Sequence, residues 1–222
     1  MALPGLLKRM AVLATALSVS SCAMIEQQAE RRRHAEERAA ALAAHQAWRA
    51  EKGWKANTYR NDPLLATATA DNASVQISLS EQRGLLLVND CIAMDFPVAT
   101  GKRSHPTPTG EFRIKGKEKD YSSNLYGKIV DATGVVVVED ADTRTDVLIE
   151  GTTFQGARMP YWMRLTDTGV GMHIGYVPGR PASHGCIRLR HDTAVRLFNL
   201  LKVGTPVVIA GEAPALQPAP AR

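Results

Sequence analysis

The sequence predicts a mainly β fold, a sandwich or a partly open barrel, with one packed helix near its C-terminal end. Short apolar runs separated by turn residues indicate the strands. In the first run Val75, Ile77 and Leu79 alternate with polar residues, which is typical of a half-buried strand. The 222 residues, 45% of them hydrophobic, are enough for one well-packed domain with extensions.

The predicted strands follow one another closely from about residue 73. Residues 85–88 and 91–96 complete a three-stranded meander with the first run. Asp192 is the expected N-cap of the helix, whose apolar face recurs at helical spacing before Gly204. The other expected strands are 111–115, 129–130, 135–138, 147–150, 163–165, 171–174 and 205–209. The folded domain is therefore expected at 73–210, followed by a Pro- and Ala-rich disordered tail at 211–222.

The first residues are typical of an export signal. Lys8 and Arg9 precede an apolar stretch of residues 10–19, which is too short to span a bilayer. Small residues then lead into Cys22, an arrangement that looks like a bacterial lipobox. The prediction is a signal peptide at 1–21 and lipid attachment at Cys22, which gives a periplasmic protein held on a membrane. The outer membrane is the favoured address, and an ordinary secretory signal is the alternative.

A lipidated N-terminus and helical spacer are expected at 22–72. Residues 25 to about 52 are rich in Ala, Glu, Arg and Gln, with no Gly or Pro before Gly53, and these residue types favour an exposed helix. They include few large apolar side chains, so this segment is not expected to build a core. No apolar heptad is sustained, and we expect a monomer.

The charge of the chain does not indicate nucleic acid binding. The formal net charge is +5, and removal of Lys8 and Arg9 leaves 25 basic against 22 acidic side chains. Basic and acidic residues are interspersed, whereas a nucleic-acid-binding protein gathers basic residues on one face.

Cys186 has neighbours that suit a nucleophile. A free thiol is mostly protonated at neutral pH and needs a base or a positive environment to react. His173, His184 and Arg188 lie close in the sequence. Gly185 permits unusual backbone angles and leaves two successive N–H groups free for a developing oxyanion. The run therefore predicts acyl transfer by a thiolate.

Three other interpretations of Cys186 are open at this point. Cys186 could be an inert buried thiol, or a metal ligand together with His173 and His184, although no fourth ligand stands at a familiar spacing. A disulfide with Cys91 would suit an oxidising compartment. Cys91 lies beside apolar residues in an expected strand, which favours a reduced core thiol.

A family resemblance distinguishes these interpretations. The run Ser-His-Gly-Cys-Ile-Arg at 183–188, with His173 upstream, resembles the signature of bacterial L,D-transpeptidases. The segment Pro-Thr-Pro-Thr-Gly-Glu-Phe at 106–112 also resembles one that recurs in that family, and the likeness covers roughly 73–210. Ten positions separate His173 from Ser183. This spacing is shorter than in many members of the family, and it is expected to shorten one wall of the site.

The resemblance implies a role for each residue of the motif. It implies that Cys186 is the nucleophile and that His173 is the general base, oriented by the backbone carbonyl of Ile174. It implies that His184 and Gly185 line the oxyanion pocket. It also implies roles on the substrate side of the site. Ser183 would hold the turn, and Arg188 would bind a carboxylate. Tyr161 and Trp162 would form the floor of the substrate groove.

The resemblance further implies a reaction on peptidoglycan stem peptides without metal or organic cofactor. Cys186 would attack the amide between the third and fourth residues of a tetrapeptide stem, releasing D-alanine and forming a thioester that an amine then attacks. Water as acceptor would give a carboxypeptidase or hydrolase instead. A non-catalytic wall-binding lipoprotein is the third alternative.

Overall fold

The computed structural model describes residues 5–211, and the side chains of residues 23–211. Residues 1–4 of the predicted signal peptide and residues 212–222 of the predicted tail lie outside the described residues. The helices are α1 (Gly5–Arg49), α2 (Asp62–Ala66) and α3 (His191–Leu200), with a 3-10 turn η1 (Trp54–Ala56) after the first. None of the described helices has an apolar stretch long enough to cross a bilayer.

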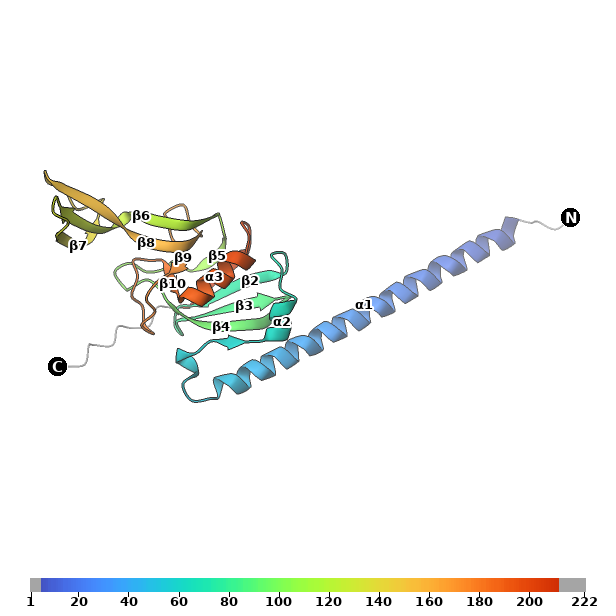
Figure 1. The fold of residues 1–222 in the computed structure, drawn as a ribbon. Helices are drawn as coiled ribbons and strands as arrows, with labels where there is room; N and C mark the ends of the chain where they lie inside the picture. The colour runs from blue at the N-terminus through green and yellow to red at the C-terminus, as the bar shows by residue number, and fades with distance from the viewer. Residues whose placement is uncertain (1–4, 212–222) are drawn as a thin grey trace.

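The strands of the described residues form one mixed, open sheet (Figure 1). Its order is β5-β11-β2-β3-β4-β10-β9-β8-β6-β7, and β1 pairs with β4 beside this path. The mainly β prediction is confirmed, and the sheet does not close into a barrel. The strands are β1 (Tyr59–Arg60), β2 (Ala73–Ser78), β3 (Arg83–Val88), β4 (Cys91–Ala99), β5 (Gly110–Arg113), β6 (Gly116–Asp131), β7 (Val136–Asp142), β8 (Thr152–Arg164), β9 (Gly171–Ile174), β10 (Ile187–Leu189) and β11 (Pro206–Ala210).

The predicted meander is present as β2, β3 and β4, which pair antiparallel in succession. The alternation in β2 places Val75 and Ile77 in the core cluster, to which Ala194 and Leu197 of α3 also belong. Helix α3 packs against β8 and β9, and Ala194 and Leu197 are fully buried. Burying one apolar stripe of the helix on the sheet is the main stabilising contribution of this layer.

Two local predictions were wrong. Residues 147–150 are an exposed connection and not a strand, and Val147 is 82% exposed. Helix α3 begins at His191 with Arg190 as N-cap, so Asp192 lies in the first turn. A carboxylate in the first turn still favours the helix through the positive end of its dipole.

Strands β6, β7 and β8 extend beyond the rest of the sheet, and we call residues 116–164 the arm (Figure 1). Within this segment the predicted strands at 129–130, 135–138 and 163–165 overlap β6, β7 and β8, whereas most of β6 and β8 was not predicted, because β6 carries mostly polar side chains. Its pairing with β8 spans Gly116 to Asp131, with a shift in register between Ser122 and Gly127. The arm bears on the site because that irregular stretch faces the cavity described below.

Helix α1 runs away from the domain at its N-terminal end, and its last turns lie against β4 (Figure 1). The helix expected over residues 25 to about 52 lies within α1. This segment contributes no residue to the main core cluster, but Ala41 and His45 in its last turns are buried. A polar contact as well as apolar burial holds these turns in place, since the partner of His45 is a carboxylate.

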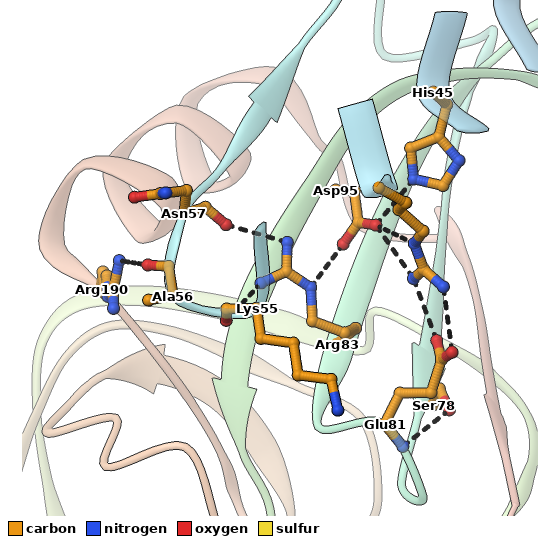
Figure 2. A network of polar contacts seen from close by, with 10 residues as sticks. His45, Lys55, Ala56, Asn57, Ser78, Glu81, Arg83, Asp95 and Arg190 are labelled. Atoms are coloured by element: carbon orange, nitrogen blue, oxygen red, sulfur yellow. Dashed lines mark hydrogen bonds and ion pairs between the residues drawn. The ribbon is translucent and has the colours of Figure 1, made fainter. Parts of the chain in front are cut away.

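Figure 2 shows that carboxylate, Asp95 of β4, among cations from two parts of the chain. Asp95 is fully buried, and Arg83 of β3 donates to it at 2.6 Å. From α1, His45 contacts it at 2.7 Å and Arg49 donates at 3.0 Å. Arg83 also donates to the backbone oxygens of Lys55 and Asn57. One buried carboxylate therefore joins the helix, the following turn and the sheet.

Candidate active site

A cavity of about 500 Å³ lies between the arm and the turn that carries Cys186. The residues at its thiol end are His173, Ile174, Gly175, Tyr176, Ser183, His184, Gly185, Cys186 and Arg188, and Thr168, Gly169 and Val170 complete that end. Its other walls come from His105 and Pro106 and, on the arm, from Tyr121, Ser123, Asn124, Leu125, Tyr126, Arg144, Ala157, Arg158 and Met159. Six of the eight residues predicted for the catalytic or substrate site therefore meet in one cavity.

The pairing of β9 with β10 brings the thiol and the imidazole together. These two strands are parallel, with Ile187 opposite Met172 and Arg188 opposite His173. Met172 and Ile187 are fully buried in the core. Because side chains alternate along a strand, His173 and Arg188 project from the opposite face, where Cys186 immediately precedes β10. The nucleophile and its expected base therefore share one face of the sheet.

His173 has the protonation state that a general base requires. Its side chain is 5% exposed, and its Nδ1 lies 2.7 Å from the backbone oxygen of Ile174. A carbonyl only accepts, so Nδ1 carries the proton and Nε2 keeps its lone pair. Burial lowers the pKa of His173 to about 4, and the charge of Arg188 contributes to the same shift. The backbone acceptor expected at Ile174 is present.

The thiol of Cys186 is also neutral at rest. Burial raises its pKa, opposed by a hydrogen bond from the Gly171 backbone and by the charge of Arg188. Its sulfur lies 3.7 Å from the backbone oxygen of Gly169, and the hydrogen bonds of the described residues include none between this sulfur and His173. Catalytic hydrogen bonds often tighten only when substrate is bound. The resting pair is a thiol beside a neutral imidazole.

Cys186 and Cys91 are both free thiols, so the disulfide between them is excluded. Cys91 is 2% exposed at the start of β4, as expected for a reduced core thiol. Among the described residues, no group of three or more His, Cys, Asp and Glu side chains is arranged to hold a metal ion.

The turn before the thiol is fixed by Ser183. Its Oγ donates to the backbone oxygen of Cys186 and accepts the N–H of Gly185 at 3.1 Å. Gly185 has φ of 111°, a conformation that favours glycine. The prediction that the Gly185 N–H is free for an oxyanion was wrong, because Ser183 occupies it. Of the two predicted backbone donors, the Cys186 N–H is the remaining candidate.

Thr107 connects this turn to the loop at 101–107. Its buried hydroxyl donates to the backbone oxygen of Gly185 at 2.7 Å and accepts the N–H of Gly101 at 2.8 Å. The segment at 106–112 was noted in the sequence without a role for this side chain. The structure gives it one, because Thr107 holds the residue that precedes the nucleophile.

Replacing Thr107 with valine is expected to lower the free energy of unfolding by about 1–3 kcal/mol. Valine has nearly the same shape, but it leaves the Gly185 oxygen and the Gly101 N–H buried without their partner. Urea unfolding of the two proteins measures the difference. Thr107→Ser keeps the hydroxyl and serves as the control. Equal unfolding midpoints for the valine and serine variants would contradict this assignment.

His184 faces the arm and not the thiol. Its Nε2 lies 3.2 Å from Asp140 of β7, and its ring stacks on Tyr126 with centroids 4.6 Å apart. His105 meets the same ring edge-on at 4.6 Å. Burial lowers the pKa of His184, and Lys102 adds to the shift. His184 therefore lines the cavity and connects the arm to the Cys186 turn, whereas His173 is the histidine that shares the face of the sheet with the thiol.

The arm residues of the cavity were missed in the sequence. The shift in register between Ser122 and Gly127 brings four successive residues to the cavity wall, as bulges beside active sites often do. Ser123 Oγ accepts the N–H groups of Leu125 and Tyr126 within this bulge. A Cβ on Gly156 would lie 1.9 Å from the Ser123 oxygen, so the fold-back requires glycine there. Gly156 is the sequence feature that could have indicated this bulge.

Tyr161 and Trp162, predicted to floor the groove, are not among the residues that line the cavity. Tyr161 has φ of 56° and packs edge-on against Phe198. Trp162 is 7% exposed and stacks on Tyr121, with ring centroids 3.9 Å apart. Since Tyr121 does line the cavity, Trp162 supports its wall from behind.

Arg188 lies half-buried at the thiol end of the cavity. Its side chain crosses Gly175 so closely that a Cβ there would lie 2.8 Å from its Cγ. Burial lowers its pKa, opposed by Cys186 and by Asp140. A guanidinium held in this way is suited to bind a carboxylate beside the nucleophile.

Known proteins match the region that forms this site. Residues 72–209 match the family YkuD, described as the L,D-transpeptidase catalytic domain. The probable L,D-transpeptidase 3 of Mycobacterium tuberculosis is 27% identical over 121 residues, covering 51% of this chain and 37% of that protein. The putative L,D-transpeptidase YkuD of Bacillus subtilis is 25% identical over 138 residues, covering 61% and 64%. The chain thus spans less than two thirds of the length of these curated relatives.

Among solved structures, an L,D-transpeptidase from Mycobacterium smegmatis is similar with a TM-score of 0.48 and 20% identity, covering 63% of this chain and 59% of that one. The family match covers more than half of the chain, and it includes Cys186, His173 and the whole of the Cys186 turn. The chain belongs to the YkuD family of L,D-transpeptidase catalytic domains.

Proposed function

We propose that the protein is a peptidoglycan L,D-transpeptidase that works through a thioester on Cys186. The observation that carries this proposal is the pairing of a neutral, buried imidazole with a neutral thiol on one face of a cavity. His173 Nε2 accepts the thiol proton as the sulfur attacks the substrate carbonyl. The Cys186 N–H is the backbone donor available to the oxyanion.

The reaction balances in two half-steps. In the first, the C–S bond forms and the C–N bond breaks, and His173 returns its proton to the amine of the leaving D-alanine. In the second, an amine of another stem, or of a protein, attacks the thioester and restores the thiol. The relatives named L,D-transpeptidases support this reaction for the chain, and Arg188 offers a carboxylate partner to the stem peptide.

Product analysis tests the proposal. The protein is incubated with tetrapeptide stems, with and without an amine acceptor, and the products are separated by mass. A transpeptidase gives cross-linked dimers only when the acceptor is present. Release of D-alanine without dimers, whatever the acceptor, would make the protein a carboxypeptidase. No reaction in either case would leave the wall-binding alternative.

We expect kcat/KM for acylation to stay high well below pH 6.5, because the pKa of His173 is lowered from 6.5 to about 4. The free protein then holds the base in its competent form until the pH approaches about 4. The unfolded chain takes up this proton first, so the stability that neutral His173 contributes is complete above pH 6.5 and is lost as the pH falls from 6.5 toward about 4. Acylation rates are measured across this range, with circular dichroism at each pH as the control for folding. An acid limb centred near pH 6.5 would contradict the assignment.

We further propose that Cys22 carries the lipid and holds the protein in the periplasm, on the outer membrane. The supporting features are the basic start, the short apolar stretch and the small residues before Cys22. Labelling of bacteria with a fatty acid tests this proposal. The parent protein should take up label and fractionate with the outer membrane. A Cys22→Ser variant that keeps the label would overturn lipid attachment at this residue.

A further inference from the structure

The cavity contains more positive charge than the reaction itself uses. Among the described residues that line it are three arginines, Arg144, Arg158 and Arg188, and none is Asp or Glu. A cavity of this kind attracts anionic groups. The three arginines differ in what they already bind, and that difference identifies the ones available to a ligand.

Arg144 is already neutralised. It donates to both carboxylate oxygens of Asp142, at 2.8 and 2.6 Å, and to the Tyr126 hydroxyl at 2.6 Å. This pairing raises the pKa of Arg144 and holds the pKa of Asp142 at about 2. Arg144 is therefore a structural part of the wall.

Arg158 and Arg188 are available in a way that Arg144 is not. Within residues 23–211, the side chains of Arg158 and Arg188 make no ion pair and no hydrogen bond, whereas other arginines do. The acidic residue that most influences Arg188 is Asp140, which is already in contact with His184 and Lys102. Arg158 is exposed on β8, opposite Ser122 of β6.

The two arginines start from different levels of the sheet. Arg188 lies opposite His173, and the adjacent Met172 lies opposite Met163 of β8. Arg158 precedes Met163 by five positions, so the two levels are roughly 13–16 Å apart at about 3.3 Å per strand residue. That separation corresponds to about four extended residues and exceeds what a single amino acid spans.

We propose that Arg158 is a second carboxylate-binding residue, so that the protein selects peptides that carry a free carboxylate besides the one that Arg188 binds. This proposal rests on the proposed function for the identity of the peptide. Arg188 binds the carboxylate nearest the thiol, and Arg158 binds a carboxylate on another residue of the same peptide. A guanidinium binds a carboxylate through two parallel hydrogen bonds and discriminates it from a carboxamide.

The test is peptide binding by titration calorimetry in a Cys186→Ala background, which needs no turnover. The two probes are a tetrapeptide stem and the same peptide with the carboxylates on the N-terminal side of the scissile amide converted to carboxamides. The carboxylate peptide should bind roughly 10-fold more tightly than the carboxamide, and Arg158→Gln should abolish that preference. Arg158→Lys, which keeps the charge but not the fork, should restore only part of it.

Arg103→Gln is the matched control, because Arg103 is exposed on the loop at 101–107 and does not line the cavity. It should bind both peptides as the parent does. The proposal is overturned if the parent does not distinguish the peptides, if Arg158→Gln keeps the preference, or if Arg103→Gln loses it equally. In the active protein, Arg158→Gln should raise KM for the carboxylate peptide with little change in kcat. Absence of any thioester on the parent would instead count against the proposed function, and the calorimetric result would still decide the role of Arg158.

Discussion

Replacing Cys186 with alanine is expected to abolish acylation by tetrapeptide stems, with a loss of roughly 10⁴-fold or more. The sulfur is the atom that forms the acyl bond, and no neighbouring side chain on the same face can replace it. His173 would keep its hydrogen bond to the Ile174 oxygen, so the cavity should remain intact. Mass spectrometry of the intact protein after mixing with substrate measures the acyl adduct directly.

Cys91→Ala is the control for this experiment. Cys91 is the other free thiol of the described residues, and burial at the start of β4 raises its pKa. Its removal should cost some stability and leave the adduct in place. An adduct that persists in the Cys186→Ala protein, or that disappears in the Cys91→Ala protein, would show that the nucleophile had been assigned to the wrong residue.

Replacing Asp95 with alanine should destabilise the protein by about 3–5 kcal/mol, as removal of one partner of a buried ion pair does. Asp95 is fully buried, and Arg83, which it binds at 2.6 Å, is 2% exposed. Without the carboxylate, Arg83 is left as a buried charge, and His45 and Arg49 lose their contact with β4, although Arg49 keeps its two hydrogen bonds to Glu81. Because folded domains are stable by about 5–15 kcal/mol, this is a large part of the total.

The matched control is Asp167→Ala. Asp167 also binds two cations, Lys115 and Arg164, but its side chain is 79% exposed, so its removal should change the unfolding midpoint little. Thermal and urea unfolding of both variants measure the difference. Equal unfolding midpoints for the two variants would mean that the Asp95 cluster contributes little to stability.

The catalytic residues could be predicted from the sequence because they lie on short local motifs. The six residues at 183–188 and His173 meet through one parallel strand pair, and the Ile174 acceptor adjoins His173. The wall formed by the arm could not be predicted in this way. Strand β6 carries mostly polar side chains, and most positions of β6 and β8 are half-buried or exposed, so no regular alternation of apolar side chains marks these strands in the sequence.

Contacts between distant segments could not be predicted from the sequence either. Thr107 bonds Gly185 across 78 positions, and His45 meets Asp95 across 50. Nothing in the spacing of either pair reveals it, since the fold alone brings them together. The Gly185 N–H illustrates the same limit at short range. The sequence correctly placed this glycine at a turn, but the orientation of the Ser183 hydroxyl determined which donor was free.

The attachment of α1 to β4 has a mechanical consequence. From Cys22, the first residue after the proposed signal peptide, to Arg49 the helix is about 42 Å long at 1.5 Å per residue, and its last turns meet Asp95 of β4. That strand also pairs with β10, where Ala99 lies opposite Arg188. A force applied to the N-terminal end of the helix therefore acts on β4, the neighbour of the strand β10 that carries Arg188. The Asp95 contacts therefore link the orientation of the helix to the sheet that carries the Cys186 turn.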